Sequence, residues 1–242
     1  MSLDVMAWIV VLALGVAPQT APDRCAAVAR RVLAEMAAAT ARGDVAEAAR
    51  LAAAGDTAES GCFSLRLASW SWHGWNGAVA AADRGGTPEA LAPVTAAVTA
   101  VTALGPPRSE AAYAAALLRA AAAAAQDERD EMLVWIEEAR ALSARLALAG
   151  PTPVLPLPID LAEGELWHGV DDYELAEAAF TRALAVADTP AAWRGLARAR
   201  DRRGNRVGAC DAYRRVAAGL ALEATPGPLA AEARGYLLRC TP

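Results

Sequence analysis

Lysine is absent from this chain of 242 residues, and histidine and aromatic residues are scarce. The two histidines, His73 and His168, do not stand in a His-Glu-x-x-His motif, and no cysteines are spaced as Cys-x-x-Cys. These absences exclude the usual zinc and thioredoxin-type sites. The chain also lacks a glycine-rich loop after a strand and a Gly-x-Ser-x-Gly elbow. We therefore expect a protein without catalytic residues, metal ion or cofactor.

Neither sign of charge is in large excess, because acidic residues outnumber basic ones only slightly and the formal net charge is −5. A chain with this balance has no overall attraction for nucleic acid or for an anionic membrane. Acidic residues do cluster at 127–131, interrupted by Arg129. Such a cluster is typical of a solvated helix start, where acidic side chains face the positive end of the helix dipole. We predict no nucleic-acid partner.

The chain is rich in alanine, which makes up much of its 55% hydrophobic content. Alanine is the best intrinsic helix former, whereas the residues that favour strands are sparse or scattered here. A chain of this length buries about 70–75% of the surface of its unfolded form, so it folds without needing a disulfide. The composition predicts an all-α fold.

The first residues contain an unbroken apolar run from 5 to 17. This length suits a secretory signal and is short for a membrane span, which needs about 20 residues. We predict a signal peptide over residues 1–21 and an exported, periplasmic or cell-envelope protein. The alternatives are an apolar first helix that caps the fold, with a cytoplasmic location, and a short uncleaved anchor. Any membrane contact would come from this segment alone.

Four cysteines fit an oxidising compartment, where they form two disulfides with three conceivable connectivities. We favour Cys25 with Cys62 and Cys210 with Cys240, because each pair joins neighbouring elements near one end of the chain. The alternative is four buried thiols that act as small apolar side chains.

Helical patterns alternate with short breakers along the rest of the chain. We predict N-terminal helix pairs over 22–149, a proline-rich linker over 150–158, and C-terminal pairs with a capping helix over 159–242. The predicted pairs are 23–42 with 45–54, 64–83 with 88–104, 109–125 with 130–148, 159–168 with 173–187, and 191–203 with 206–222, followed by a helix at 229–238. Recurring pairs indicate an α-solenoid of about five antiparallel hairpins.

The last two pairs carry the most specific pattern. Gly164 lies in the first predicted helix of one pair, and Ala176 and Phe180 of its second helix recur 33 residues later as Ala209 and Tyr213. Over residues 157–222 the chain resembles the tetratricopeptide repeat (TPR) family. The resemblance implies a TPR-like superhelix that scaffolds protein–protein interactions. The pattern departs from the family at three polar positions, Asp160, Glu163 and Arg200.

Three arginines at four-residue spacing, Arg194, Arg198 and Arg202, form one stripe of a helix. In the TPR register this stripe faces the concave groove, together with Glu165 and Leu161 of the preceding pair. Arginines there can bind a protein or peptide partner that is acidic or has a free carboxylate. The alternative is a solvated face with ion pairs to Asp201 and Asp211.

A tryptophan-rich segment suggests a different function. On its helix, Trp72 and Trp75 share the apolar stripe, whereas Trp70 and His73 lie elsewhere and could form an aromatic platform. We therefore keep an envelope glycan-binding module and a helical subunit of a homo-oligomer as alternatives to a non-catalytic interaction scaffold.

Overall fold

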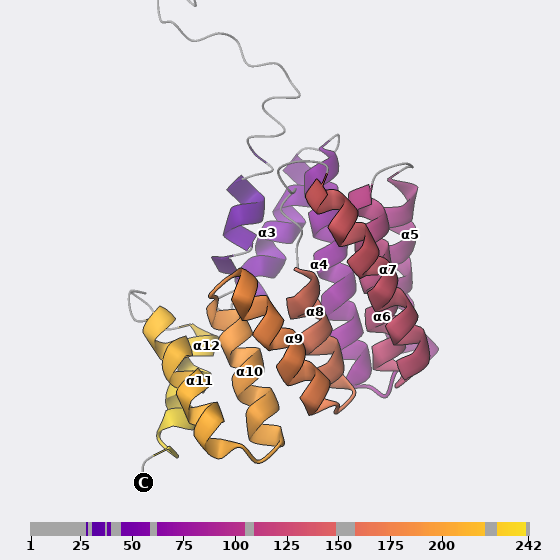
Figure 1. Cartoon of the computed structure of the whole chain (residues 1–242). Helices are drawn as coiled ribbons and strands as arrows, with labels where there is room; N and C mark the ends of the chain where they lie inside the picture. The colour runs from indigo at the N-terminus through magenta and orange to yellow at the C-terminus, as the bar shows by residue number, and fades with distance from the viewer. Residues whose placement is uncertain are drawn as a thin grey trace, which may run out of the picture.

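A computed structural model describes residues 28, 31–36, 38–39, 45–58, 62–104, 109–148, 158–220 and 227–240 (Figure 1). All regular secondary structure within these ranges is helical, which confirms the all-α prediction. The predicted leader at 1–21, Cys25, and residues 150–157 of the predicted linker lie outside the described residues.

The helices begin and end close to the bounds that the sequence predicts. In order they are α3 (Val45–Ala58), α4 (Phe63–Ala82), α5 (Pro88–Ala103), α6 (Ser109–Ala125), α7 (Arg129–Leu148), α8 (Ile159–Gly169), α9 (Tyr173–Val186), α10 (Pro190–Arg202), α11 (Arg206–Gly219) and α12 (Pro228–Leu237). The largest differences are at the ends of α3 and α11, where helical periodicity alone does not fix the last turn.

Consecutive helices pack in adjacent pairs, α4 with α5, α6 with α7, α8 with α9 and α10 with α11 (Figure 1). Neighbouring pairs meet through α4 with α6, α5 with α6 and α9 with α10. The helix that follows each pair therefore packs on the pair before it, and α12 packs on α11 at the end of the series.

The turn inside each of these four pairs has the same hydrogen bonding. The backbone N–H of residues 86, 128, 172 and 205 donates to the carbonyl five residues earlier, and the preceding N–H donates to the carbonyl three residues earlier. The residue that donates the second of these hydrogen bonds has positive φ in every turn: Gly85 (75°), Asp127 (57°), Asp171 (62°) and Gly204 (78°). This is the Schellman arrangement, in which a left-handed residue ends the helix and satisfies its last carbonyls.

Side-chain caps begin several of the helices. Thr87, Asp172, Thr189 and Asn205 each accept a hydrogen bond from the backbone N–H three residues on, at the starts of α5, α9, α10 and α11. Proline occupies the first turn of α5, α10 and α12, where its missing N–H costs no helical hydrogen bond. These local signals explain why the sequence predicts the boundaries well.

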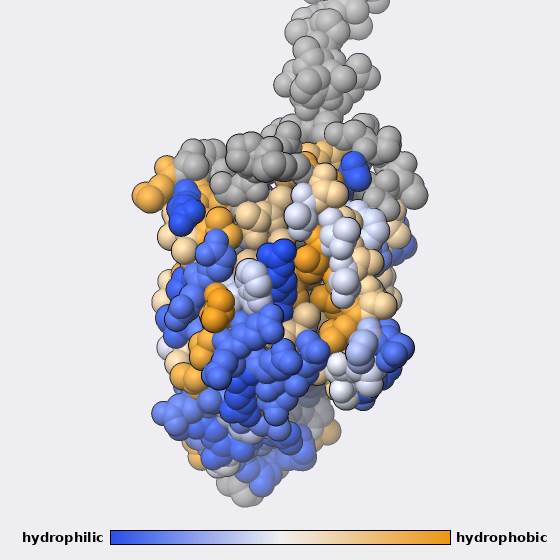
Figure 2. All heavy atoms as spheres, turned by 90° about the vertical axis from the view of Figure 1, so that its right-hand side faces the viewer, coloured by the Kyte–Doolittle hydropathy of each residue, from blue (hydrophilic) through white to orange (hydrophobic). Residues whose placement is uncertain are grey.

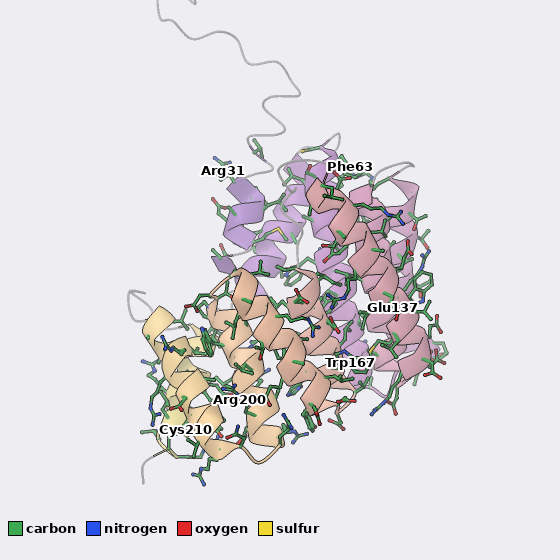
Figure 3. The ribbon with its side chains drawn as sticks, in the orientation of Figure 1. Arg31, Phe63, Glu137, Trp167, Arg200 and Cys210 are labelled. Atoms are coloured by element: carbon green, nitrogen blue, oxygen red, sulfur yellow. A yellow bond between two sulfur atoms is a disulfide. The ribbon has the colours of Figure 1, made fainter. Side chains whose placement is uncertain are left out.

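The interior relies on small residues and close helix contacts. A Cβ on Gly74 of α4 would lie 2.7 Å from Cβ of Ala97 and 2.7 Å from Cδ2 of Leu118, so Gly74 marks the close approach of α4 to α5 and α6. Larger side chains fill the remaining space; Trp167 of α8, labelled in Figure 3, is buried in the main core. The alanine-rich helices therefore pack closely at these contacts.

The surface is mixed in character. Figure 2 shows hydrophilic side chains gathered over the lower half of one side of the molecule, with apolar side chains exposed in its middle. The acidic residues 127–131 are all exposed at the α6–α7 turn and the start of α7. Arg129 pairs with Asp127 at 3.4 Å and also donates to the carbonyl of Val170.

Candidate functional site

Helix α10 presents the three predicted arginines along one face. Its buried residues are small or apolar, and they face the core: Ala191, Ala192, Gly195, Leu196, Ala197 and Ala199. Arg194, Arg198 and Arg202, which we call the arginine face, become more exposed along the helix, with side-chain exposures of 22%, 40% and 60%. The first two guanidinium groups are therefore partly shielded from water, which strengthens their charge interactions.

Each arginine of this face meets a residue of a neighbouring helix or turn. Arg194 pairs with Glu165 of α8 at 3.4 Å. Arg198 donates two hydrogen bonds to Glu232 of α12, at 2.8 and 2.7 Å. These contacts bring α8, α10 and α12 together on one side of the molecule.

The arginine face continues to the α8–α9 turn. There Arg202 donates to the hydroxyl of Tyr173 at 3.0 Å and lies 3.9 Å from Asp171. At the other end, Leu161 lies one turn before Glu165 on α8, half-buried and packed against the main core. The predicted groove residues therefore lie on adjoining surfaces of α8 and α10.

The alternative ion pairs predicted from sequence are not the ones formed. Asp201 accepts a hydrogen bond from the hydroxyl of Tyr236, and Asp211 pairs with Arg214 of its own helix. The three arginines pair instead with Glu165 of α8, Glu232 of α12 and Asp171 of the α8–α9 turn.

Glu232 is the acidic centre of this region. Burial would raise the pKa of its carboxyl, but hydrogen bonds and charge from Arg198, a hydrogen bond from Tyr213, and the charge of Arg194 lower the pKa below the ordinary value of 4.5. Glu232 is therefore charged at neutral pH. A forked arginine and a tyrosine hydroxyl are together a strong arrangement for a carboxylate.

Two buried polar atoms beside this region have no hydrogen-bond partner among the described residues: Nε2 of His168 and Nε of Arg194. Burial lowers the pKa of His168, and the nearby charges of Arg198 and Arg202 lower it further against opposing effects of Glu165 and Asp171. His168 is therefore neutral at pH 7. Buried polar groups without a hydrogen-bond partner are uncommon in folded proteins, so these two nitrogen atoms mark a candidate place for a polar ligand.

A second charged cluster joins α7, α8 and α9. Arg140 and Arg182 each pair with both Asp160 and Glu163; the Arg182 distances are 3.0 and 2.7 Å. The two polar residues of α8 that depart from the TPR pattern, Asp160 and Glu163, thus form ion pairs with one arginine of α7 and one of α9.

The third departure, Arg200 (Figure 3), donates to Glu177 of α9 at 2.8 Å, and Arg203 also pairs with this carboxylate. Burial would raise the pKa of Glu177, but its hydrogen bonds from Arg200 and Arg203 lower it. These ion pairs join α10 and the turn after it to α9 of the preceding helix pair.

The predicted aromatic platform lies on α4. Trp70 is half-buried and packs against the main core, while His73 is exposed. His73 packs edge-on against the ring of Trp72 and not of Trp70, at a centroid distance of 5.7 Å. Trp72 and Trp75 are partly buried against core clusters. Trp70 therefore offers only part of its ring to solvent.

The predicted pairing of Cys210 with Cys240 is confirmed. Their sulfur atoms are 2.00 Å apart and join α11 to the residues that follow α12. Cys62, just before α4, is also disulfide-bonded, and its predicted partner, Cys25, lies outside the described residues.

Within the described ranges, no group of three or more histidine, cysteine or acidic residues is placed to hold a metal ion. No helix in the part of the chain that the structure describes is both long and apolar enough to cross a membrane. Comparisons of the chain with protein-family models, curated proteins and solved structures found no match.

The sequence pattern alone did not predict that Glu232, Tyr213 and His168 belong to this region. A usable signal was present, because Arg198 and Glu232 are separated by 34 residues, close to the repeat length. Residues one repeat apart fall on successive equivalent helices and can lie side by side. Glu232 is also the only acidic residue of α12.

Proposed function

We propose that this chain is a non-catalytic scaffold for protein–protein interaction, whose arginine face binds an acidic peptide, or a partner subunit with a free carboxylate. The observation that carries the proposal is the partly shielded guanidinium of Arg194. It makes one long hydrogen bond, to Glu165 at 3.4 Å, and its buried Nε has no partner among the described residues. A ligand carboxylate would accept hydrogen bonds from the exposed part of this guanidinium, whose side chain is 22% exposed, in a partly desolvated place where such bonds are strongest.

The same proposal includes a TPR-like α-solenoid of antiparallel hairpins. It is supported by the four identical turns, by the packing of each pair on the one before it, and by the position of Phe180 beside Gly164. In such stacks the first helices of successive pairs line one continuous surface. Glu165 of α8, Arg194 of α10 and Glu232 of α12 would lie along that surface.

We place the scaffold in the cell envelope. The proposal is supported by the Cys210–Cys240 disulfide and the disulfide of Cys62, because such bonds persist in oxidising compartments. The apolar run at 5–17 supports export independently.

A peptide-binding experiment tests the arginine face. Fluorescein-labelled peptides of one sequence, ending either in a free carboxylate or in an amide, are titrated with the full chain. We expect the free carboxylate to bind about tenfold more tightly, which corresponds to one charge-assisted contact. Arg194→Gln should remove this preference. Arg214→Gln, which makes the same charge change beside Asp211 on α11, should keep it.

Two results would contradict the proposal. One is equal affinity for the two peptides; the other is the same loss of affinity in both variants, which would indicate an effect of net charge alone. Arg198 is unsuitable as the test position, because it holds Glu232 and its loss would leave a buried carboxylate unpaired.

A further inference from the structure

The C-terminal helix α12 contributes one apolar face to the fold. Leu229, Ala233 and Tyr236, at the first, fifth and eighth positions of a helical stripe, are at most 6% exposed. They belong to a core cluster with residues of α10 and α11 that is separate from the main core. The ring of Tyr236 stacks on Tyr213 of α11 at a centroid distance of 4.3 Å. Removing α12 would therefore uncover this cluster without opening the main core.

The contact also has a polar centre. Both carboxylate oxygens of Glu232 accept hydrogen bonds from Arg198, and Oε1 accepts a further one from the hydroxyl of Tyr213 at 2.8 Å. We call the surface formed by Arg198, Tyr213 and the apolar residues around them the helix seat. Its arginine and tyrosine bind a carboxylate, and its apolar residues bind an apolar stripe. The helix seat therefore favours a helix that has an acidic residue beside an apolar stripe.

Helix α12 is weakly stabilised by its own sequence. It has only ten residues, and its first turn has no side-chain cap. Isolated helices of this length are not stable in water, so α12 depends on docking. The disulfide between Cys240 and Cys210 keeps it close to the seat, and Arg206 adds a hydrogen bond to the carbonyl of Arg239. A tether of this kind maintains an effective concentration on the order of millimolar.

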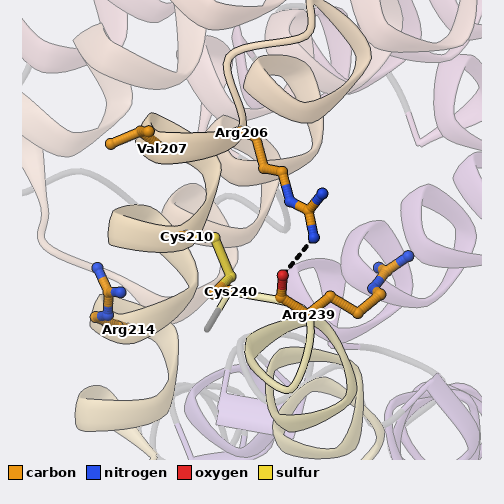
Figure 4. A pocket seen from close by; sticks show the side chains of 6 residues that line it. All are labelled: Arg206, Val207, Cys210, Arg214, Arg239 and Cys240. Carbon is orange, nitrogen blue, oxygen red and sulfur yellow. Dashed lines mark hydrogen bonds between the residues drawn. A yellow bond between two sulfur atoms is a disulfide. The ribbon is translucent and has the colours of Figure 1, made fainter. Parts of the chain in front are cut away.

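The disulfide borders a hollow at the surface. Cys210 and Cys240 line a hollow of about 310 Å³ together with Val207 and three arginines, Arg206, Arg214 and Arg239 (Figure 4). Positive charge beside a disulfide attracts an incoming thiolate and stabilises the thiolate that leaves. A dithiol reductant would attack one sulfur and form a mixed disulfide while the other cysteine leaves as a thiolate. The second thiol of the reductant then displaces the remaining cysteine, so that the reductant becomes a disulfide and both cysteines become thiols.

We propose that α12 is a displaceable occupant of the helix seat, that the Cys210–Cys240 disulfide locks it there, and that the seat otherwise takes a partner helix of the same pattern. That pattern is apolar residues at the first, fifth and eighth positions with an acid at the fourth, as in Leu229, Glu232, Ala233 and Tyr236. The inference rests on the proposed function, because it gives the partner chemistry and the regulation of the arginine face.

The test uses a fluorescein-labelled peptide of residues 227–238 and two forms of the full chain. One form has the intact disulfide; the other carries Cys210→Ser and Cys240→Ser, which leaves the disulfide of Cys62 in place. We expect the peptide to bind the serine form at least about tenfold more tightly, because it then competes with an α12 that is held only by its chain connection to α11 and no longer by the disulfide as well. A peptide with Glu232→Gln should bind about tenfold more weakly, since it loses the charge-assisted bonds from Arg198.

Hydrogen exchange of the serine form completes the test. We expect faster exchange of α12 amides with unchanged protection of α4 to α9, which shows that the rest of the chain is folded. Equal affinity of the peptide for both forms, equal affinity of the two peptides, or full protection of α12 in the serine form would each overturn the inference. The carboxylate preference of Arg194 is measured separately, so failure of the helix seat would leave the proposed function standing, and failure of the proposed function would be seen in that separate measurement.

Discussion

The ring of Phe180 lies against the backbone of Gly195 in the next helix pair. A Cβ on residue 195 would stand 2.6 Å from Cδ1 of Phe180, closer than real Cβ contacts allow. On the other side, a Cβ on Gly164 would lie 2.6 Å from Cε1 of the same ring. Phe180 is fully buried, so one aromatic side chain fills the space between α8, α9 and α10.

This contact predicts the effect of Gly195→Ala. The added methyl group must displace the buried ring, and overpacking of this kind costs about 1–3 kcal/mol of unfolding free energy. Chemical denaturation measures the loss. Gly235→Ala on α12 is the matched control, because no atom lies within 4 Å of its Cβ position, and it should raise stability by about 0.5–1 kcal/mol. The double variant Phe180→Leu, Gly195→Ala should lose less unfolding free energy than the sum of the losses of the two single variants. Losses that simply add would show that the two residues are not in contact.

The α6–α7 turn predicts a stabilising substitution. Asp127 has a φ of 57°, a conformation that glycine adopts at less cost than other residues. Its ion pair with Arg129 is exposed and contributes little. Asp127→Gly should therefore raise the unfolding free energy by about 0.5–1 kcal/mol.

Asp130→Gly is the control for this turn, because Asp130 lies inside α7 and glycine weakens a helix by about 1 kcal/mol. Thermal unfolding of the two variants should move in opposite directions. A lower melting temperature for Asp127→Gly would show that the left-handed residue is not under strain.

Acid should destabilise the protein through Glu232 and Glu177. The pKa of each is lower in the folded state than the ordinary value of 4.5. Their contribution is therefore complete above pH 4.5 and is lost as the pH falls through the folded-state pKa. Glu232→Gln should lower stability at pH 7 and flatten its decline in acid. Melting temperatures across this pH range check both effects; an unchanged slope would contradict the pairing with Arg198.

His168 predicts an earlier and separate change. Burial lowers its pKa below the ordinary value of 6.5, so the unfolded chain binds a proton more readily than the folded one. Stability should therefore begin to fall as the pH drops below 6.5, before the carboxylates titrate. His168→Gln should remove this early decline. Direct titration of the His168 ring by NMR provides the check, and a pKa at or above 6.5 would refute the assignment.

Export and oxidation can be measured together on the protein from its own cells. We expect an intact mass that lacks residues 1–21 and no thiol labelling until the protein is reduced. A full-length mass with four labelled cysteines would instead place the chain in a reducing compartment and make the apolar run part of the retained protein.

The local features of the sequence predicted the helices well. Thr189, Pro190 and the glycine at 204 mark the ends of α10 by capping, fixed φ and a left-handed turn, and these effects involve residues close in sequence. The disulfide between Cys210 and Cys240 was also predictable, because the repeat order places its two helices side by side.

The partners of the charged residues were less predictable. Asp160 and Glu163 place two negative charges on a helix that packs against other helices. Arg140 and Arg182, from two of those helices, pair with them. Such contacts depend on how the helices are rotated and offset against one another, which local periodicity does not specify.

The sequence by itself therefore determined the all-α fold, the helix boundaries and the stripe of Arg194, Arg198 and Arg202, because alanine content, caps and four-residue spacing act within one helix. Only the tertiary structure decided that Glu232 pairs with that stripe and that Gly195 faces Phe180. These relationships join residues of different helices. They exist only when the helix pairs have packed, because burial and close approach then fix which side chains meet.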